Sequence, residues 1–138
     1  MSVRLVSVAP DESVQAAIAR MVEADVGSVA VCEGARLAGI FTERDVLRLA
    51  GERAPLDELL VRDAMTTPVQ TVSGDDDILA AARIMGERAI RHLPVVQGDN
   101  VLGIVGIRDV LGALTERLWR THDEQARETV RELLGRRR

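Results

Sequence analysis

The feature that most constrains this chain is an internal repeat. Shifted by 64 positions, residues 6–50 align with residues 70–114 without a gap, and 14 of the 45 aligned pairs are identical. The identical pairs fall at turns and helix starts as well as in apolar runs, as with Gly34 and Gly98. One copy of such a unit leaves an apolar face that it cannot bury alone, so the repeat predicts two units packed together.

Both copies predict the same order of elements. In the first copy an extended piece at 5–8 precedes a turn, and residues 13–25 carry apolar side chains at three- and four-residue spacing, typical of an amphipathic helix. Two β-rich runs then flank Gly34, where a hairpin turn needs a positive φ, and a second helix starts at residue 43. The second copy repeats this pattern from residue 69 to the helix start at 107. We therefore predict an α+β fold of two β-α-β-β-α units around a pseudo-twofold axis.

The remaining segments predict helices. We divide the chain into a first repeat at 1–52, a linker at 53–68, a second repeat at 69–116 and a helical tail at 117–138. Within the linker, residues 56–65 are typical of a helix. Residues 107–134 carry an interrupted apolar stripe and predict one long helix. Trp119 either packs on its own subunit or anchors a contact between subunits.

Composition limits the function. The hydrophobic fraction of 46% is enough for a core, whereas the aromatic fraction of 1% and the net charge of −4 argue against nucleic-acid binding. No apolar run is long enough to span a membrane, so we expect a cytoplasmic protein. Cys32 lies in an apolar run and is expected to be a small buried hydrophobe. His92 and His122 are isolated, which predicts no metal site, and no catalytic constellation is visible, which predicts no enzyme.

The segment 42-TERD-45 has two interpretations that are compatible with each other. Thr followed three residues later by an acidic residue, before an apolar helix, is a capping box, which needs no ligand. The same residues could bind a nucleotide, because a carboxylate accepts from both ribose hydroxyls and a helix N-terminus attracts phosphate. The acidic run 75–77 is expected to cap the helix that begins near Ile78 rather than to bind a metal.

The motifs together resemble a known family. The segments 89-AIRHLPVV-96 and 103-GIVGIRD-109, with the linker end 61-VRDAMTTPV-69, resemble a cystathionine-β-synthase (CBS) domain. Over residues 3–116 the chain is similar to a tandem pair of such domains, a Bateman module, of the stand-alone bacterial type. The resemblance implies a regulatory sensor that binds AMP, ADP, ATP, S-adenosylmethionine or NAD as an effector, requires no other cofactor and forms a homodimer. The regulated protein stays unknown.

The resemblance also implies two clefts between the units. In the first cleft, Asp45 would hold the ribose and Thr42 the phosphates, while residues of the second unit border the base and reach toward the phosphates. The residues of this site are Thr42, Arg44, Asp45, Pro68, Val69, Thr71, Arg91, His92, Leu93 and Pro94. His92 alone would equally suit a partly buried structural role.

The second cleft departs from the family pattern. Its residues are Ser7, Val8, Gly27, Ser28, Val29, Gly106, Arg108 and Asp109. Gly106 stands in place of the hydroxyl residue, and Gly27 and Ser28 stand in place of the Arg91–His92 pair. Losing a charge-assisted hydrogen bond costs about 1.5–3 kcal/mol, so we expect this cleft to be the weaker site for a phosphate-bearing ligand. An alternative function is a protein-interaction module with vestigial clefts.

Overall fold

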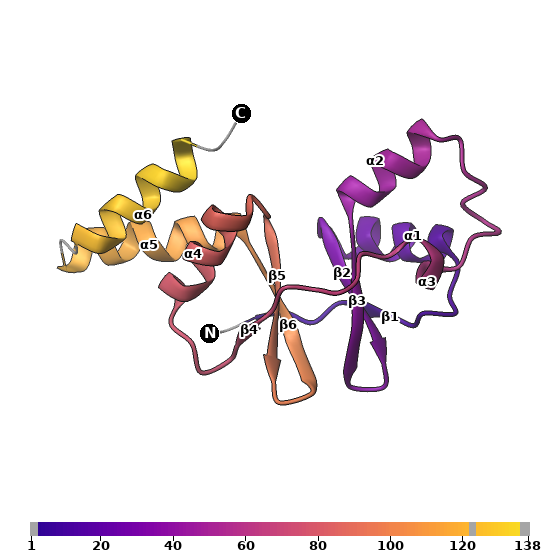
Figure 1. Cartoon of the computed structure of the whole chain (residues 1–138), viewed down its shortest axis with the longest axis horizontal. Helices are drawn as coiled ribbons and strands as arrows, with labels where there is room; N and C mark the ends of the chain where they lie inside the picture. Colours follow the sequence, from indigo (N-terminus) through magenta and orange to yellow (C-terminus); the bar gives the residue numbers. More distant parts are fainter. Residues whose placement is uncertain (1–2, 122–123, 136–138) are drawn as a thin grey trace.

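The two predicted units are both present, and each contributes three strands to one six-stranded sheet (Figure 1). The computed structural model describes residues 3–121 and 124–135. The strands are β1 (Ser7–Val8), β2 (Ser28–Glu33), β3 (Arg36–Thr42), β4 (Val72–Ser73), β5 (His92–Gln97) and β6 (Asn100–Gly106). The helices are α1 (Val14–Ala24), α2 (Glu43–Gly51), α3 (Val61–Ala64), α4 (Ile78–Arg88), α5 (Ile107–Thr121) and α6 (Glu124–Gly135).

The sheet has the symmetry that the repeat predicts. Its strand order is β1-β2-β3-β6-β5-β4, so the two units meet between β3 and β6 at the pair Arg36 and Asn100. Within each unit the short outer strand is parallel to its neighbour and the hairpin is antiparallel. Both hairpins turn at glycines with positive φ, 63° at Gly34 and 61° at Gly98, as expected.

Alternating side chains of the hairpin strands divide the core into an outer and an inner part. In β2, Val29 and Val31 pack against the helices of the first unit, whereas Ala30 and Cys32 pack against Val101 of the second. Figure 1 shows the helices on the two outer sides of the molecule with the strands between them. Cys32 is buried, as predicted, and burial raises the pKa of its thiol.

Side chains cap the first turns of α1 and α4. Ser13 caps α1 by accepting a hydrogen bond from the Ala16 N–H at 3.0 Å. Asp77 caps α4 by accepting from the Leu79 N–H at 3.3 Å, and Arg117 of α5 binds the same carboxylate at 2.9 Å. Asp77 of the acidic run therefore caps α4, as expected from the sequence, whereas the Asp76 and Asp75 carboxylates accept from the Ser73 N–H and the Gln97 amide.

The linker prediction was wrong for most of its length. Only Val61–Ala64 is helical, whereas residues 56–60 form turns and a bridge. The carbonyls of Leu59 and Leu56 accept hydrogen bonds from the N–H groups of Val14 and Gln15 at 2.8 and 2.9 Å. These bonds satisfy N–H groups in the first turn of α1 that have no partner within the helix. Because the Leu56 and Leu59 carbonyls accept from α1, they do not accept from N–H groups of a continuous linker helix.

The tail prediction was wrong as well. The described residues of this segment, 107–121 and 124–135, form two separate helices, α5 and α6, and α6 packs against both α4 and α5 (Figure 1). Leu133 of α6 is buried in the core of the second unit with Leu114 of α5 and Met85 of α4. The turn back lets α6 bury its apolar stripe against its own subunit. Trp119 stays 80% exposed, so it does not pack on its own subunit.

Candidate functional site

The capping box at the start of α2 forms as predicted. The Thr42 N–H donates to Asp45 Oδ2 at 2.9 Å, and the Thr42 hydroxyl lies 3.3 Å from the same oxygen. The other oxygen, Oδ1, accepts from the Thr66 hydroxyl at 3.3 Å and lies 3.5 Å from Arg48 Nη2. Asp45 is only 6% exposed. Both carboxylate oxygens therefore already have partners in the absence of a ligand.

The repeat-related position at the start of α5 is more open. Asp109 is exposed, and its Oδ2 accepts from the Gly106 N–H at 3.2 Å. The second half of the capping box is missing because Gly106 has no hydroxyl. The Asp109 side chain is consequently more accessible than that of Asp45, which is buried.

Three residues of the two units converge beside the start of α2. A Cβ placed on Gly27 would lie 2.5 Å from Glu43 Oε1 and 3.2 Å from His92 Nε2. The Glu43 N–H donates to the Gly27 carbonyl at 3.0 Å, which fixes this loop against the helix start. Any larger residue at position 27 would displace Glu43 or His92. The structure thus brings His92 of β5 to the N-terminus of α2, as the first predicted cleft requires.

His92 is half-buried at this junction. Burial lowers the pKa of its imidazole from the ordinary value of 6.5. Nearby Glu43 opposes that shift, Arg91 reinforces it, and Asp109 opposes it. His92 is therefore neutral at pH 7 and would offer a phosphate a hydrogen bond rather than a positive charge.

A hollow of about 340 Å³ lies between the two units farther along the strands. Its lining combines the start of β3, the linker and the end of the second hairpin. The lining residues are Arg36, Leu37, Ala38, Thr67, Pro68, Val69, Thr71, Val96, Gly98 and Asp99. Three predicted residues, Pro68, Val69 and Thr71, lie in it.

The hollow connects to the capping box through the linker. The backbones of Thr66 and Ile40 exchange two hydrogen bonds, of 2.8 and 3.1 Å, so the linker is held along β3. Thr66 contacts Asp45, and the next residue, Thr67, lines the hollow. Thr66 and Thr67 therefore link Asp45 to the hollow through two consecutive linker residues.

Other predicted residues take different places. Arg44, Arg91 and Arg108 are exposed near the helix starts, and the Arg91 carbonyl accepts from the Ile107 N–H at 2.9 Å. Ser28 is buried opposite Thr42, and the Ser7 carbonyl accepts from Arg20 at 2.8 Å. The remaining four side chains are buried, the first three of them in the helix-side cores: Val8, Val29, Leu93 and Pro94. A cleft could use these four mainly through their backbone.

Sequence reasoning did not identify several residues of this region. Arg36 was assigned to the hairpin turn and Leu37 and Ala38 only to a strand, although all three residues line the hollow. Thr66 was not assigned a role, although it binds Asp45. The roles of Thr66 and of the three β3 residues depend on where the linker pairs with β3. No local sequence pattern predicts the position of this pairing.

Neither a metal-binding cluster nor a membrane-spanning helix is present among residues 3–121 and 124–135. No group of three or more His, Cys, Asp or Glu side chains there could hold a metal ion, and His122 lies outside this part. No helix in the same part of the chain is long and apolar enough to cross a membrane.

Comparisons with known proteins identify the family. The family model of the CBS domain matches residues 1–52 and 61–116. A CBS-domain protein of Agrobacterium tumefaciens has a solved structure with a TM-score of 0.73 and 32% identity, covering 81% of this chain and 90% of that one. A CBS-domain protein of Pyrobaculum aerophilum, solved in complex with AMP, has a TM-score of 0.73 and 26% identity, covering 79% and 85%.

Similar sequences also occur within longer proteins. An uncharacterized 33.4 kDa protein of Thermofilum pendens is 40% identical over 92 residues, which are 66% of this chain and 30% of that protein. The chain spans 30 to 66% of the length of three such relatives from Thermofilum pendens, Methanopyrus kandleri and Acidianus ambivalens. With both repeats matched and the paired fold formed, the chain belongs to the CBS-domain family and carries a tandem pair of these domains.

Proposed function

We propose that this CBS pair is a regulatory module that binds an adenosyl ligand in the first cleft between its repeats. The observation that carries the proposal is the hollow of about 340 Å³ that both repeats and the linker line. Small-molecule sites are usually concave hollows of a few hundred Å³ in which a small number of polar groups orient the ligand. A similar pair has been solved in complex with AMP, which supports an adenine nucleotide as the ligand class.

The lining suits an adenine base. Leu37, Pro68 and Val69 offer apolar surface for the two faces of a ring, while Thr71 and the linker backbone offer hydrogen bonds for its edge. Val96 in the hollow lies four residues from His92 on β5, a distance of about 13 Å along a strand. A nucleotide extended along β5 would therefore place its base in the hollow and its phosphate near His92 and the start of α2.

The ribose would replace an existing contact of Asp45. Because Oδ2 is used by the Thr42 backbone, the sugar hydroxyls would compete for Oδ1, which now accepts from Thr66 at a long 3.3 Å. The capping hydrogen bond can stay in place during this exchange. The phosphate would meet the α2 N-terminus, the Thr42 hydroxyl and the exposed Arg44 and Arg91.

The second cleft is proposed as the weaker site for phosphate. Gly106 supplies no hydroxyl, and Gly27 and Ser28 supply no cationic group at the matching position. The exposed Asp109 could still accept ribose hydroxyls. We therefore propose that this cleft favours adenosine-like ligands over nucleotides with several phosphates.

The module would act by conformational selection rather than by catalysis. An adenosyl ligand that touches both repeats favours one relative arrangement of them, to the extent that it binds that arrangement better than others. We propose that a homodimer transmits this change to a regulated protein. No catalytic step is assigned to any residue.

A second candidate function is a protein-interaction module with unused clefts. The engagement of both Asp45 oxygens and the absence of a hydroxyl at Gly106 favour it. Ligand binding distinguishes the two candidates, because a ligand that binds the folded chain raises its melting temperature by mass action.

The test is a thermal-shift series with AMP, ATP, S-adenosylmethionine and NAD. At a ligand concentration of 100 times Kd the stabilisation is about 2.7 kcal/mol. We expect a shift with at least one phosphate-bearing ligand, reduced more by Asp45→Asn than by the matched variant Asp109→Asn. No shift with any of the four would favour the interaction module. Loss of binding in Asp109→Asn, with Asp45→Asn unaffected, would reverse the ranking of the clefts.

A further inference from the structure

The outer edge of the sheet differs between the two units. In each unit the short outer strand pairs with the hairpin and then turns away toward the first helix. In the first unit this turn, residues 9–11, borders a hollow of about 350 Å³, which the end of the β2 hairpin strand at 32–34 and Arg62 of α3 complete. A hollow of this volume is large enough for a small molecule. It shares no lining residue with the hollow of the first cleft.

In the second unit the matching edge is closed by hydrogen bonds. The Gly74 N–H donates to the Val96 carbonyl at 2.8 Å. The Gln97 amide donates to Asp75 Oδ2 at 3.2 Å. A Cβ placed on Gly74 would lie 2.8 Å from the Leu102 side chain and 3.0 Å from the Gln97 side chain, so both side chains cover this turn. The turn is therefore held against the hairpin by its backbone and by side chains.

The first unit lacks these hydrogen bonds because of two sequence differences between the repeats. Pro10 stands in place of Gly74 and has no N–H, so it gives no hydrogen bond to the Cys32 carbonyl. Glu33 stands in place of the amide donor of the second unit, and a carboxylate cannot donate to Asp11. The edge of the first unit therefore stays open, with acceptor groups on both sides of the hollow.

Three charged side chains line this hollow without an internal partner. Asp11, Glu33 and Arg62 are exposed, and none of them takes part in an ion pair or a side-chain hydrogen bond within the described part of the chain. The backbone of Arg62 is nevertheless fixed, since its N–H donates to the Pro10 carbonyl at 3.0 Å. Two carboxylates and one guanidinium give the lining a net negative charge. A complementary ligand would carry one anionic group and an excess of positive charge.

We propose that this hollow binds a free basic α-amino acid, such as arginine or lysine. The carboxylate of the ligand pairs with the Arg62 guanidinium, whose planar fork matches it. The α-ammonium and the cationic side chain of the ligand pair with the carboxylates of Asp11 and Glu33. The Cys32 carbonyl accepts a further N–H, and the methylene stem lies along the apolar turn at 9–10. This site goes beyond the nucleotide cleft and does not depend on it.

The test is a titration of the isotope-labelled full chain with L-arginine and L-lysine, followed by amide resonances in NMR spectra. We expect saturable shifts that concentrate at residues 9–11, 32–34 and 62. Norleucine lacks the side-chain ammonium of lysine, and cadaverine lacks its carboxylate. Each should bind about tenfold more weakly than lysine or worse, because one charge-assisted hydrogen bond is missing. The absence of saturable shifts with both amino acids, or shifts confined to other surfaces, would overturn the proposal.

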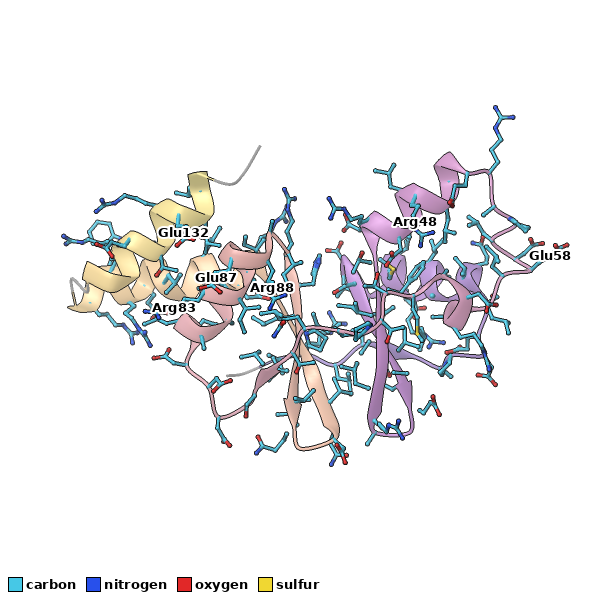
Figure 2. The ribbon with its side chains drawn as sticks, in the orientation of Figure 1. Arg48, Glu58, Arg83, Glu87, Arg88 and Glu132 are labelled. Carbon is cyan, nitrogen blue, oxygen red and sulfur yellow. The ribbon has the colours of Figure 1, made fainter. Side chains whose placement is uncertain are left out.

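Variants of the lining assign the contacts. Arg62→Gln and Glu33→Gln should each weaken binding about tenfold, and Arg62→Gln should also remove most of the preference for lysine over cadaverine. Glu58→Gln is the matched control and should leave binding unchanged. Figure 2 shows Glu58 on the linker at the outer rim of the first unit, away from the β2–β3 hairpin, and it does not line the hollow. All three side chains are exposed, so the fold should be kept, which circular dichroism checks.

Two results would contradict this assignment. Unchanged affinity in Arg62→Gln would show that the guanidinium does not hold the ligand carboxylate. An equal loss in Glu58→Gln would show that binding depends on the overall charge of the first unit rather than on this hollow.

Discussion

At the scale of single residues, the two repeat-related aspartates show how one motif can serve two roles. Asp45 is buried and accepts from the Thr42 backbone and the Thr66 hydroxyl, whereas Asp109 is exposed and accepts from the Gly106 N–H. The sequence 42-TERD-45 was sufficient to predict the cap, because a capping box is local. The Thr66 contact joins residues 21 positions apart and could not be predicted from local spacing.

The difference between these aspartates predicts unequal effects on stability. Asp45→Ala removes the N3 half of the capping box and leaves the Thr42 N–H and the Thr66 hydroxyl without their acceptor, which should lower the free energy of unfolding by about 1–2 kcal/mol. Asp109→Ala should cost less, since water can replace an exposed carboxylate. Urea denaturation of both variants measures the two values. Equal losses would contradict the structural role of Asp45 in the capping box.

His92 predicts a pH dependence of stability. Its folded-state pKa lies below 6.5 because burial disfavours the charged form, so the unfolded chain binds the proton more readily. The contribution of the neutral His92 imidazole to the free energy of unfolding is complete above pH 6.5. This contribution is lost as the pH falls from 6.5 through the folded-state pKa. Glu12 and Asp77 also have lowered pKa values, with ordinary values of 4.5 and 3.8, so they titrate in a more acidic range.

The measurement is the urea midpoint between neutral pH and pH 5, for the natural sequence and for His92→Gln. The glutamine variant should lose less stability on acidification, because it has no imidazole to protonate. A variant with the same pH dependence as the natural sequence would show that His92 is not the titrating group.

At the scale of elements, local patterns predicted the helices and hairpins inside the repeats but not those outside them. Caps, turn glycines and apolar spacing are local signals, and α1, α4 and both hairpins follow them. The linker and tail instead depend on distant partners. The carbonyls of Leu56 and Leu59 accept hydrogen bonds from α1, and α6 packs against α4. Neither segment therefore forms the continuous helix that its own sequence predicts.

The packing of α6 can be tested by a matched pair of leucines. Leu133 is buried in the core of the second unit, whereas the neighbouring Leu134 is half-exposed. Leu133→Ala should lower the free energy of unfolding by about 2–5 kcal/mol, the usual cost of a cavity at a buried leucine. Leu134→Ala should cost much less. Chemical denaturation measures both, and similar small losses would show that α6 does not dock on the second unit.

At the scale of the whole molecule, the repeat determines most of the architecture. It predicted two units of one topology, and the sheet order β1-β2-β3-β6-β5-β4 is symmetric about the junction of β3 and β6. The tail breaks this symmetry, because α6 covers only one of the two related helix faces. The sequence alone could not predict this, since the repeat contains no counterpart of α6.

The central claim is that an adenosyl ligand binds in the first cleft. A titration of the isotope-labelled full chain with AMP, followed by amide resonances in NMR spectra, tests it most directly. We predict that saturable shifts concentrate at residues 36–38 and 66–71 and at the start of α2, with smaller changes around Asp109. The absence of saturable shifts with AMP, ATP, S-adenosylmethionine and NAD, or shifts confined to surfaces outside the clefts, would contradict the claim.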